Sequence, residues 1–296
     1  MSRMALIISV LCMALLFPPT IAYTKDNVYF EHIGNEDGLS NLAVSSIVQD
    51  SKGFLWFGTQ GGLNRYDGYE FKEYKKKPFD QNSLSHDLVQ TLYMDENDVL
   101  WIGTYHGLNR LDLKTDEIIR YRNVPGDPTS LSNDVVVSIN RDAEGNLWVG
   151  TLDGLNVFHE ETGTFRRYVH DPENKTSLAN NTVRAIYKDL KGRLWIGTYG
   201  GLCQYRPGTD DFLTWRHDED DPESIASNNV MVIAQQKRGE LLLGTWGGGG
   251  LSRFDIQSGK MENFTLPDNR SYSMLVGYDG TIYIGSWGGG LMEFNT

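Results

Sequence analysis

Residues 54–66 read FLWFGTQGGLNRY, and related versions of this stretch occur six times in the chain of 296 residues. Successive copies are 45, 47, 47, 47 and 41 residues apart, measured at the glycine of the W-x-G-T core: Gly58, Gly103, Gly150, Gly197, Gly244 and Gly285. Repetition with a period of roughly 20–50 residues is typical of solenoids and propellers, so the repeat decides the fold.

Each copy contains four short strand-like runs. In the first copy these runs are residues 44–48, 55–59, 63–66 and 71–74, and a D-x-x-G turn and a Gly-rich turn separate the first three. Alternating or β-branched and aromatic runs bounded by such turns predict antiparallel strands joined as hairpins. No window shows a persistent apolar spacing of about 3.6 residues, so we expect few helices.

The number of strands indicates how the chain closes. The sixth copy lacks a fourth strand, whereas Asn27–Ile33 is strand-like and belongs to no copy. Pairing of this N-terminal strand with the last copy would leave no open sheet edge, which is how propellers close. The sequence thus predicts an all-β fold, a β-propeller of six four-stranded blades. The alternative is a larger ring, for example of seven blades, of which these residues form the N-terminal part.

The composition narrows the classes of partner. The chain is 40% hydrophobic and contains 7 Trp, 15 Tyr and 12 Phe, which is enough for a packed core. We therefore assign residues 23–296 to one propeller domain. The formal net charge is -12. An acidic surface of this kind repels nucleic acid and anionic lipid, so we expect neither as a partner.

Residues 1–22 form a separate element. Arg3 supplies a positive charge, residues 5–17 form an apolar stretch, and Thr20–Ala22 resembles a cleavage site. This pattern predicts a secretory signal peptide and a periplasmic location. The apolar stretch is shorter than the span of about 20 residues that crosses a membrane, and an uncleaved anchor is the alternative. Only Cys203 would remain after cleavage, which excludes an intramolecular disulfide.

Comparison of the copies separates scaffold from candidate function. The Asp of the D-x-x-G turn recurs, so we assign it to backbone hydrogen bonds in a hairpin rather than to a metal. An acidic run at 218–223 lacks the spacing of a calcium loop and is expected to be a solvated loop. We assign the tryptophan of the repeat to the core. It recurs as Trp56, Trp101, Trp148 and Trp195 and is replaced by Leu242 and Tyr283.

The turns between the second and third strands differ from copy to copy. In a propeller these turns share one face with the loops between blades, which makes that face the expected binding surface. Flat aromatic rings beside hydrogen-bonding groups suit a polar ligand with apolar faces, such as a sugar. The alternative is that the aromatic rings only pack on adjacent loops. The candidate ligand-binding residues are Gln60, Tyr105, His106, Asp153, Tyr199, Trp246 and Trp287.

The repeat resembles a known family. Its composite is D-x-x-G-x-L-W-[IVF]-G-T-x-x-G-L-[NS]-R-[YF]-[DN], and the first copy supplies residues 53–59 and 64–68 of this pattern. It is similar to the two-component regulator propeller repeat over residues 28–295. The resemblance implies the periplasmic sensing part of a hybrid histidine kinase or membrane diguanylate cyclase, often with a carbohydrate ligand. No kinase or cyclase sequence follows within these residues, so the signalling output is not carried over.

Motifs of common enzymes are missing from the sequence. It contains no H-E-x-x-H, G-x-S-x-G, Walker loop or Cys cluster, so we expect no metal, no cofactor and no catalysis by this chain. One alternative is a secreted propeller lyase or hydrolase, with His106 and a carboxylate such as Asp153 as base and acid. Another is a scaffold for protein docking. The main hypothesis is a sensor that binds a small molecule or oligosaccharide and acts with a signalling output domain or partner.

Overall fold

The computed structural model describes residues 31–294. It divides after Ile33, and the compact unit that begins at Gly34 contains all strands of the described part. The predicted signal peptide and most of the predicted strand Asn27–Ile33 lie outside the described residues, and Glu31–Ile33 form no strand. The only helix among residues 31–294 is a short 3-10 turn, η1 (Asn35–Asp37), as expected from the sequence.

Five sheets have four strands each, joined in chain order. Blade 1 contains β1 (Val44–Gln49), β2 (Leu55–Thr59), β3 (Gly62–Tyr66) and β4 (Phe71–Tyr74). Blade 2 contains β5 (Val89–Met94), β6 (Val99–Thr104), β7 (Gly107–Asp112) and β8 (Glu117–Tyr121). Blade 3 contains β9 (Val136–Arg141), β10 (Leu147–Thr151), β11 (Gly154–His159) and β12 (Thr164–Tyr168).

The second half repeats the pattern. Blade 4 contains β13 (Val183–Lys188), β14 (Leu194–Thr198), β15 (Gly201–Arg206) and β16 (Asp211–Trp215). Blade 5 contains β17 (Asn229–Ala234), β18 (Glu240–Trp246), β19 (Leu251–Asp255) and β20 (Met261–Phe264). Blade 6 contains β21 (Ser271–Val276), β22 (Ile282–Ser286) and β23 (Gly290–Phe294), and its described sheet has three strands.

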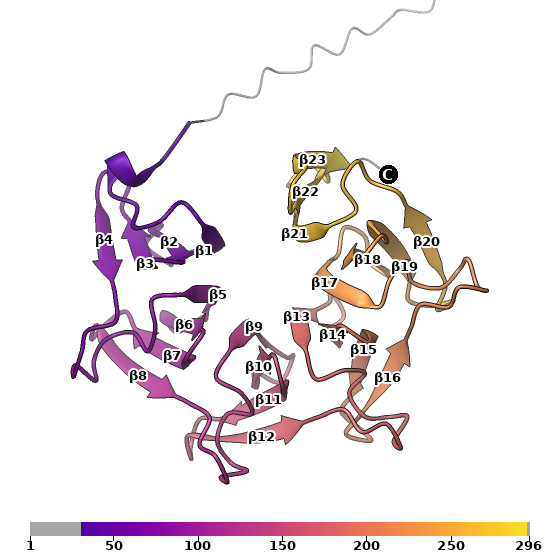
Figure 1. Cartoon of the computed structure of the whole chain (residues 1–296), viewed down its shortest axis with the longest axis horizontal. Coiled ribbons are helices and arrows are strands. Elements are labelled where there is room, and N and C mark those ends of the chain that lie inside the picture. Colours follow the sequence, from indigo (N-terminus) through magenta and orange to yellow (C-terminus); the bar gives the residue numbers. More distant parts are fainter. Residues whose placement is uncertain (1–30, 295–296) are drawn as a thin grey trace, which may run out of the picture. The chain divides into compact units, whose positions relative to one another are not determined.

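The six sheets follow one another around a central axis, with the first strand of each sheet innermost (Figure 1). Every pairing within a sheet is antiparallel, as in β1 with β2 and β2 with β3. The predicted six-bladed β-propeller is therefore confirmed. The predicted closing strand stays a prediction, because residues 27–30 are outside the described part.

Neighbouring blades meet where an inner strand packs on the W-x-G-T glycine of the preceding blade. A Cβ at Gly150 would lie 2.6 Å from Cγ1 of Val183, and one at Gly103 would lie 2.7 Å from Cγ1 of Val136. Both valines are fully buried. Glycine is needed here because the next blade occupies the space that a side chain would take.

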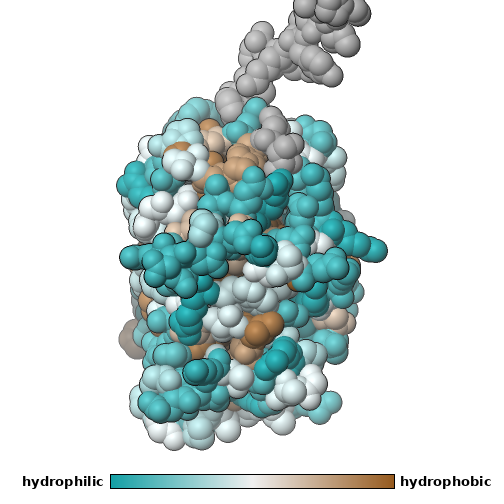
Figure 2. Space-filling model, turned by 90° about the vertical axis from the view of Figure 1, so that its right-hand side faces the viewer, coloured by the Kyte–Doolittle hydropathy of each residue, from teal (hydrophilic) through white to brown (hydrophobic). Residues whose placement is uncertain are grey.

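The first and sixth blades each expose one side. Ile47 of β1 is 56% exposed, whereas the corresponding Ile186 of β13 is 7% exposed. Leu275 and Leu291 of the sixth sheet are also exposed. Figure 2 shows apolar surface in the upper part of the view, where the sixth sheet lies, above a mostly hydrophilic side. Within residues 34–294 the inner strands of blades 1 and 6 do not pack on each other as those of neighbouring blades do.

The D-x-x-G aspartate holds its turn and the core tryptophan together. Asp50 accepts hydrogen bonds from the backbone N–H of Lys52 and Phe54, both at 3.0 Å, which confirms the turn role predicted from the sequence. Its second carboxylate oxygen also accepts a bond of 2.9 Å from the Trp56 indole. The same indole bond recurs in blades 2 to 4, from Trp101, Trp148 and Trp195 to Asp95, Asp142 and Asp189.

The repeat tryptophans are buried, as predicted, and so are the apolar residues of the loops between blades, Leu84, Leu131, Leu178 and Ile225. Loop serines beside them bond the backbone; Ser83, for example, accepts a bond of 2.9 Å from the N–H of Lys77 and donates one of 3.0 Å to the carbonyl of Asp80. Cys203 of β15 is fully buried and unpaired. The core thus consists of apolar layers between successive blades.

Candidate functional site

One face of the propeller carries the turns between second and third strands. The backbone N–H of Tyr105 bonds the carbonyl of Leu88 at 3.1 Å, and that of Trp287 bonds the carbonyl of Arg270 at 3.1 Å. Each of these bonds ties a turn to the loop that enters the same blade. We call this side the loop face. Six of the residues predicted as ligand-binding lie in its turns, and the seventh, Trp246, is the last residue of the strand that leads into one, but the seven do not form one cluster.

Two of the predicted residues meet on the loop face. The rings of Trp246 and Trp287 are 5.5 Å apart between centroids, and Tyr272 of β21 lies 5.6 Å from Trp287 and 6.4 Å from Trp246. Trp287 is 62% exposed, and Tyr272 is also exposed. We call these three rings the aromatic cluster. An exposed group of rings on this face provides flat apolar surface for a ligand.

Arg184 of β13 reaches the aromatic cluster from blade 4. Its guanidinium carbon lies 5.9 Å from the centroid of the Tyr272 ring, so its side chain passes the inner edge of blade 5. Its Nε is buried without a hydrogen-bond partner, and Arg184 has no ion pair within residues 31–294. An arginine without a carboxylate beside exposed rings can donate hydrogen bonds to a polar ligand.

Sequence comparison missed Arg184 and Tyr272. Both occupy the second position of an inner strand, and the equivalent residues by strand register in the other blades are Ser45, Gln90, Val137 and Met231. This variation is as large as that of the predicted turns. It could have identified the position, because side chains that line the centre of a ring have no common packing partner.

A salt bridge fixes the turn that carries Trp287. Arg270 donates two bonds to Asp268, at 2.8 and 2.9 Å, and the backbone N–H of Gly288 bonds the same carboxylate at 3.0 Å. The Arg270 hydrogen bonds, helped by the backbone, lower the pKa of Asp268 to about 2. The carboxylate is therefore charged at neutral pH and holds the glycine turn beside the aromatic cluster.

The histidine considered for catalysis lies on the opposite part of the loop face. Nδ1 of His106 is 3.9 Å from the carboxylate of Asp134, and its ring centroid is 6.4 Å from that of His86. Asp153 instead accepts a bond of 2.9 Å from Asn181. No hydrogen bond or ion pair joins His106 to Asp153 among the described residues, so these two side chains do not form the acid–base pair considered from the sequence.

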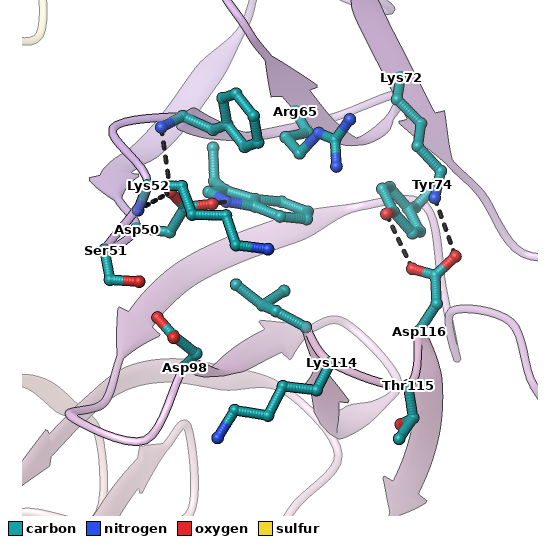
Figure 3. A pocket seen from close by; sticks show the side chains of 13 residues that line it. Asp50, Ser51, Lys52, Arg65, Lys72, Tyr74, Asp98, Lys114, Thr115 and Asp116 are labelled. Carbon is teal, nitrogen blue, oxygen red and sulfur yellow. Dashed lines mark hydrogen bonds and ion pairs between the residues drawn. The ribbon is translucent and has the colours of Figure 1, made fainter.

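The face with the D-x-x-G turns holds a pocket of about 310 Å³ between blades 1 and 2. Its apolar floor contains Phe54, Trp56 and Leu113. Figure 3 shows Lys52 and Arg65 extending from blade 1 on one side and Lys114 and Thr115 from blade 2 on the other. We call it the basic pocket. It was not predicted from the sequence.

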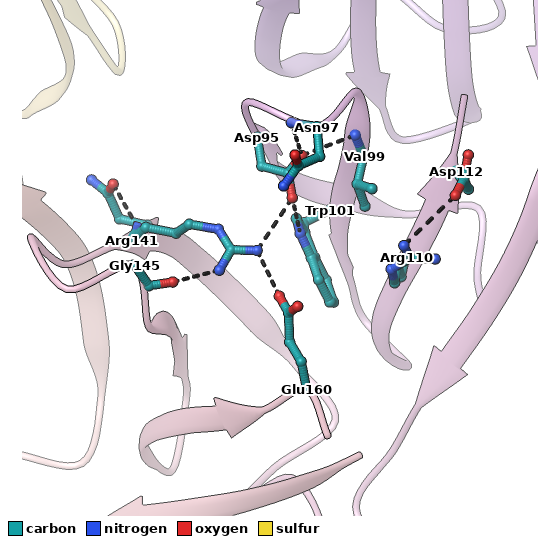
Figure 4. A network of polar contacts seen from close by, with 10 residues as sticks. Asp95, Asn97, Val99, Trp101, Arg110, Asp112, Arg141, Gly145 and Glu160 are labelled. Carbon is teal, nitrogen blue, oxygen red and sulfur yellow. Dashed lines mark hydrogen bonds and ion pairs between the residues drawn. The ribbon is translucent and has the colours of Figure 1, made fainter. Parts of the chain in front are cut away.

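At the interface between blades 2 and 3, the cationic side chain is paired with carboxylates of the protein. Between blades 2 and 3, Arg141 donates a bond of 3.2 Å to Asp95 and another of 2.7 Å to Glu160 (Figure 4). It also donates a bond of 2.5 Å to the carbonyl of Gly145. Both Nη1 and Nη2 of this guanidinium are therefore paired, and the guanidinium joins the two blades.

Two further searches cover the described residues. Among residues 31–294, no helix is both long and apolar enough to cross a membrane. The same range contains no group of three or more His, Cys, Asp or Glu side chains placed to hold a metal ion.

Sequence comparison identifies the repeat. Residues 38–61, 83–106, 130–153 and 177–200 match the two component regulator propeller family. These four segments correspond to blades 1 to 4. The predicted resemblance to this family is therefore confirmed for these four segments.

The chain is also similar to a histidine kinase and to solved structures. A stretch of 60 residues is 43% identical to Histidine kinase P4 from Formosa agariphila and covers 20% of this chain and 4% of the kinase. The extracellular domain of BT3049 from B. thetaiotaomicron, described as a hybrid two component system, is 23% identical with a TM-score of 0.48. That alignment covers 90% of this chain and 53% of the other. The chain thus spans only part of the length of both proteins.

Enzymes also share the fold. Virginiamycin B lyase from Staphylococcus aureus is 14% identical, with a TM-score of 0.63 and coverage of 86% of this chain and 84% of the lyase. At this identity the likeness concerns the propeller fold alone. Fold does not determine function, so the function must be argued from the site.

Proposed function

We propose that this chain is an extracytoplasmic, non-catalytic sensor propeller that binds a small polar ligand, such as a carbohydrate, on its loop face. The repeat matches a family named for two-component regulators, and the aligned kinase stretch supports a role in signalling. Signal output would come from a further domain or partner. The predicted export by residues 1–22 supports a periplasmic location.

The aromatic cluster is the observation that carries the proposal. Trp246, Tyr272 and Trp287 present rings within 5.5–6.4 Å of one another at the surface, and Arg184 adds free hydrogen-bond donors. Aromatic faces beside a few directed polar groups are the usual composition of small-molecule sites. Sugars fit such a site because their C–H faces pack on rings and their hydroxyl groups accept and donate hydrogen bonds.

The test is a thermal-shift screen of the chain with neutral and acidic oligosaccharides, followed by calorimetry of any hit. A ligand that binds only the folded state raises the melting temperature in a concentration-dependent manner. We expect Trp246→Ala and Trp287→Ala to weaken binding about tenfold or more, because buried aromatic contacts dominate many interfaces.

Tyr278→Ala provides the matched control. Tyr278 is an exposed aromatic residue of the same blade, in the turn between β21 and β22 on the opposite face. Its removal should leave ligand affinity unchanged. Equal loss of affinity in all three variants, or full affinity in both tryptophan variants, would place the ligand elsewhere.

A further inference from the structure

The basic pocket has an unusual charge balance for this chain. Four cationic residues line it, Lys52, Arg65, Lys72 and Lys114, together with three carboxylates, Asp50, Asp98 and Asp116. The whole chain carries a formal net charge of -12. Cationic side chains therefore gather here although the chain as a whole is acidic. Whether they can bind a ligand depends on whether they already pair with carboxylates of the protein.

Two of the carboxylates are occupied by the fold. Both oxygens of Asp50 accept hydrogen bonds from its own turn and from Trp56. Asp116 accepts bonds from Lys72 at 2.8 Å and from the Tyr74 hydroxyl at 2.9 Å. Because Asp116 pairs with Lys72, that lysine belongs to the contact between blades 1 and 2. Blades 3 and 4 repeat the contact with Asp210 and Tyr168.

Three cations remain without a carboxylate. Lys52, Arg65 and Lys114 form no ion pair within residues 31–294, and Nε of Arg65 is buried without a hydrogen-bond partner. Asp98 is the one lining carboxylate that the neighbouring groups leave unpaired. Three free positive charges thus face one free negative charge around an apolar floor.

The strand register adds an independent observation. Arg65 of β3 lies directly opposite Lys72 of β4. Like charges in this position destabilise a sheet. No other described blade opposes two cations at this position: the pairs are Arg110 with Ile119, Val157 with Arg166, Gln204 with Leu213, and Arg253 with Glu262. Asp116 accepts its hydrogen bond from Lys72 and interacts with Arg65 only through the attraction between their charges, so the hydrogen-bond donors of the Arg65 guanidinium remain available.

We propose that the basic pocket binds an oxyanion, with the Arg65 guanidinium as its main donor and the ammonium groups of Lys52 and Lys114 as supporting charges. Guanidinium groups bind carboxylate, sulfate and phosphate through paired hydrogen bonds. The Arg65 guanidinium is positioned by the Phe54 ring, whose centroid lies 4.8 Å from its central carbon. This site lies on the face opposite the aromatic cluster and is independent of the sensor proposal.

The floor of the basic pocket bears on which kind of molecule contains the anionic group. Phe54, Trp56, Tyr74 and Leu113 line it and give it apolar surface beside the cations. A free inorganic anion would use only the charged rim, whereas an acidic sugar would also cover the floor. The shared chemistry is the oxyanion, and the experiment below separates the two sources.

The test titrates the full chain with sodium sulfate and with sodium glucuronate by calorimetry, at constant ionic strength set with sodium chloride. We expect saturable binding of at least one of them. Arg65→Gln should weaken it about tenfold or more, the size expected for loss of a charge-assisted, bidentate contact. The variant should melt close to the wild type in chloride, because it removes the repulsion between Arg65 and Lys72 together with the attraction of Arg65 to Asp116 and Asp67.

Arg110→Gln is the matched control, because Arg110 has the same register position in blade 2 but lies 3.7 Å from Asp112. It should bind like the wild type. Binding of sulfate alone assigns the pocket to a free anion, and tighter binding of glucuronate assigns it to an acidic sugar. Equal binding by wild type, Arg65→Gln and Arg110→Gln, or no saturable binding of either anion, would overturn the proposal.

Discussion

Blades 1 to 4 each have the tryptophan of the repeat in the core, whereas blades 5 and 6 lack it and have a tryptophan on the loop face. In the first four blades the first aspartate of the D-x-x-G turn, which is D-x-x-D in blade 2, bonds the indole of a buried tryptophan. In blades 5 and 6 the aspartate is replaced by Gln236 and Gly277, and the tryptophan by Leu242 and Tyr283. The two changes occur together because each group is the hydrogen-bond partner of the other.

The last two blades carry tryptophan on the loop face instead. Trp246 is the last residue of β18 and Trp287 directly follows β22, and longer glycine-rich turns come after both. Gly247, Gly248 and Gly250 have positive φ values, which other residues adopt only at a cost. The comparison teaches that the scaffold is most regular in blades 1 to 4, where the family matches lie, and diverges where the candidate ligand site lies.

The largest expected difference concerns these two kinds of tryptophan. Trp148→Ala should lower the free energy of unfolding by about 3–5 kcal/mol, because a fully buried ring leaves a cavity. Trp287→Ala should cost less than about 1 kcal/mol, since the ring is largely exposed. Chemical denaturation followed by circular dichroism measures both. Similar losses for the two variants would contradict the division into core and face residues.

A smaller difference is expected at the glycines of the W-x-G-T core. Gly150→Ala places a methyl group 2.6 Å from Val183 of the next blade, whereas at Gly285 the only contact closer than 3.4 Å is with the Ser273 hydroxyl of the same sheet. Overpacking should cost about 1–3 kcal/mol at Gly150 and less at Gly285, where the serine can rotate. Thermal denaturation of both variants checks this. A larger loss at Gly285 would show that its sheet is tightly covered.

The smallest effect concerns the aspartate of the turn. Burial by itself would raise the pKa of Asp189, but hydrogen bonds from Trp195 and from Arg193 outweigh it and leave the pKa below its usual range. A lowered pKa stabilises the fold above the pKa of the unfolded chain, about 3.9, and this contribution is lost as the pH falls through the folded value.

Asp189→Asn should therefore cost about 1–2 kcal/mol at neutral pH, the size of a few charge-assisted hydrogen bonds. The difference from the wild type should shrink as the pH falls below about 4. Denaturation curves over this pH range measure it, with Asp220→Asn in an exposed loop as control. A constant difference at every pH would show that charge is not what the turn requires.

Most of the fold could be predicted from the sequence because the pattern that predicts one blade occurs six times. The glycine spacing gave the blades, and the D-x-x-G turn gave the hairpin between the first two strands. The Asp–Trp bond was missed, since each position was compared with its own copies and not with its partner. The pairing of Asp189 with Trp195, six residues apart, could have been inferred from the fact that blades 5 and 6 lack both the aspartate and the tryptophan.

The candidate site was less predictable. Trp246 and Trp287 were identified as members of variable turns, but their contact with Tyr272 depends on how blades 5 and 6 pack. Arg184 comes from a blade that is not a neighbour of Tyr272, so no sequence spacing could join them. The basic pocket likewise depends on the register of β3 and β4, which sets Arg65 against Lys72.

The buried thiol of blade 4 can be used to measure how often this blade opens locally. Cys203 is fully enclosed, and burial raises the pKa of its thiol, so a labelling reagent reaches a reactive thiolate only when the blade opens. The labelling rate of residues 34–294, in which it is the single cysteine, would report local opening of blade 4 without any introduced tag. A ligand on the loop face that rigidifies neighbouring blades would slow that reaction.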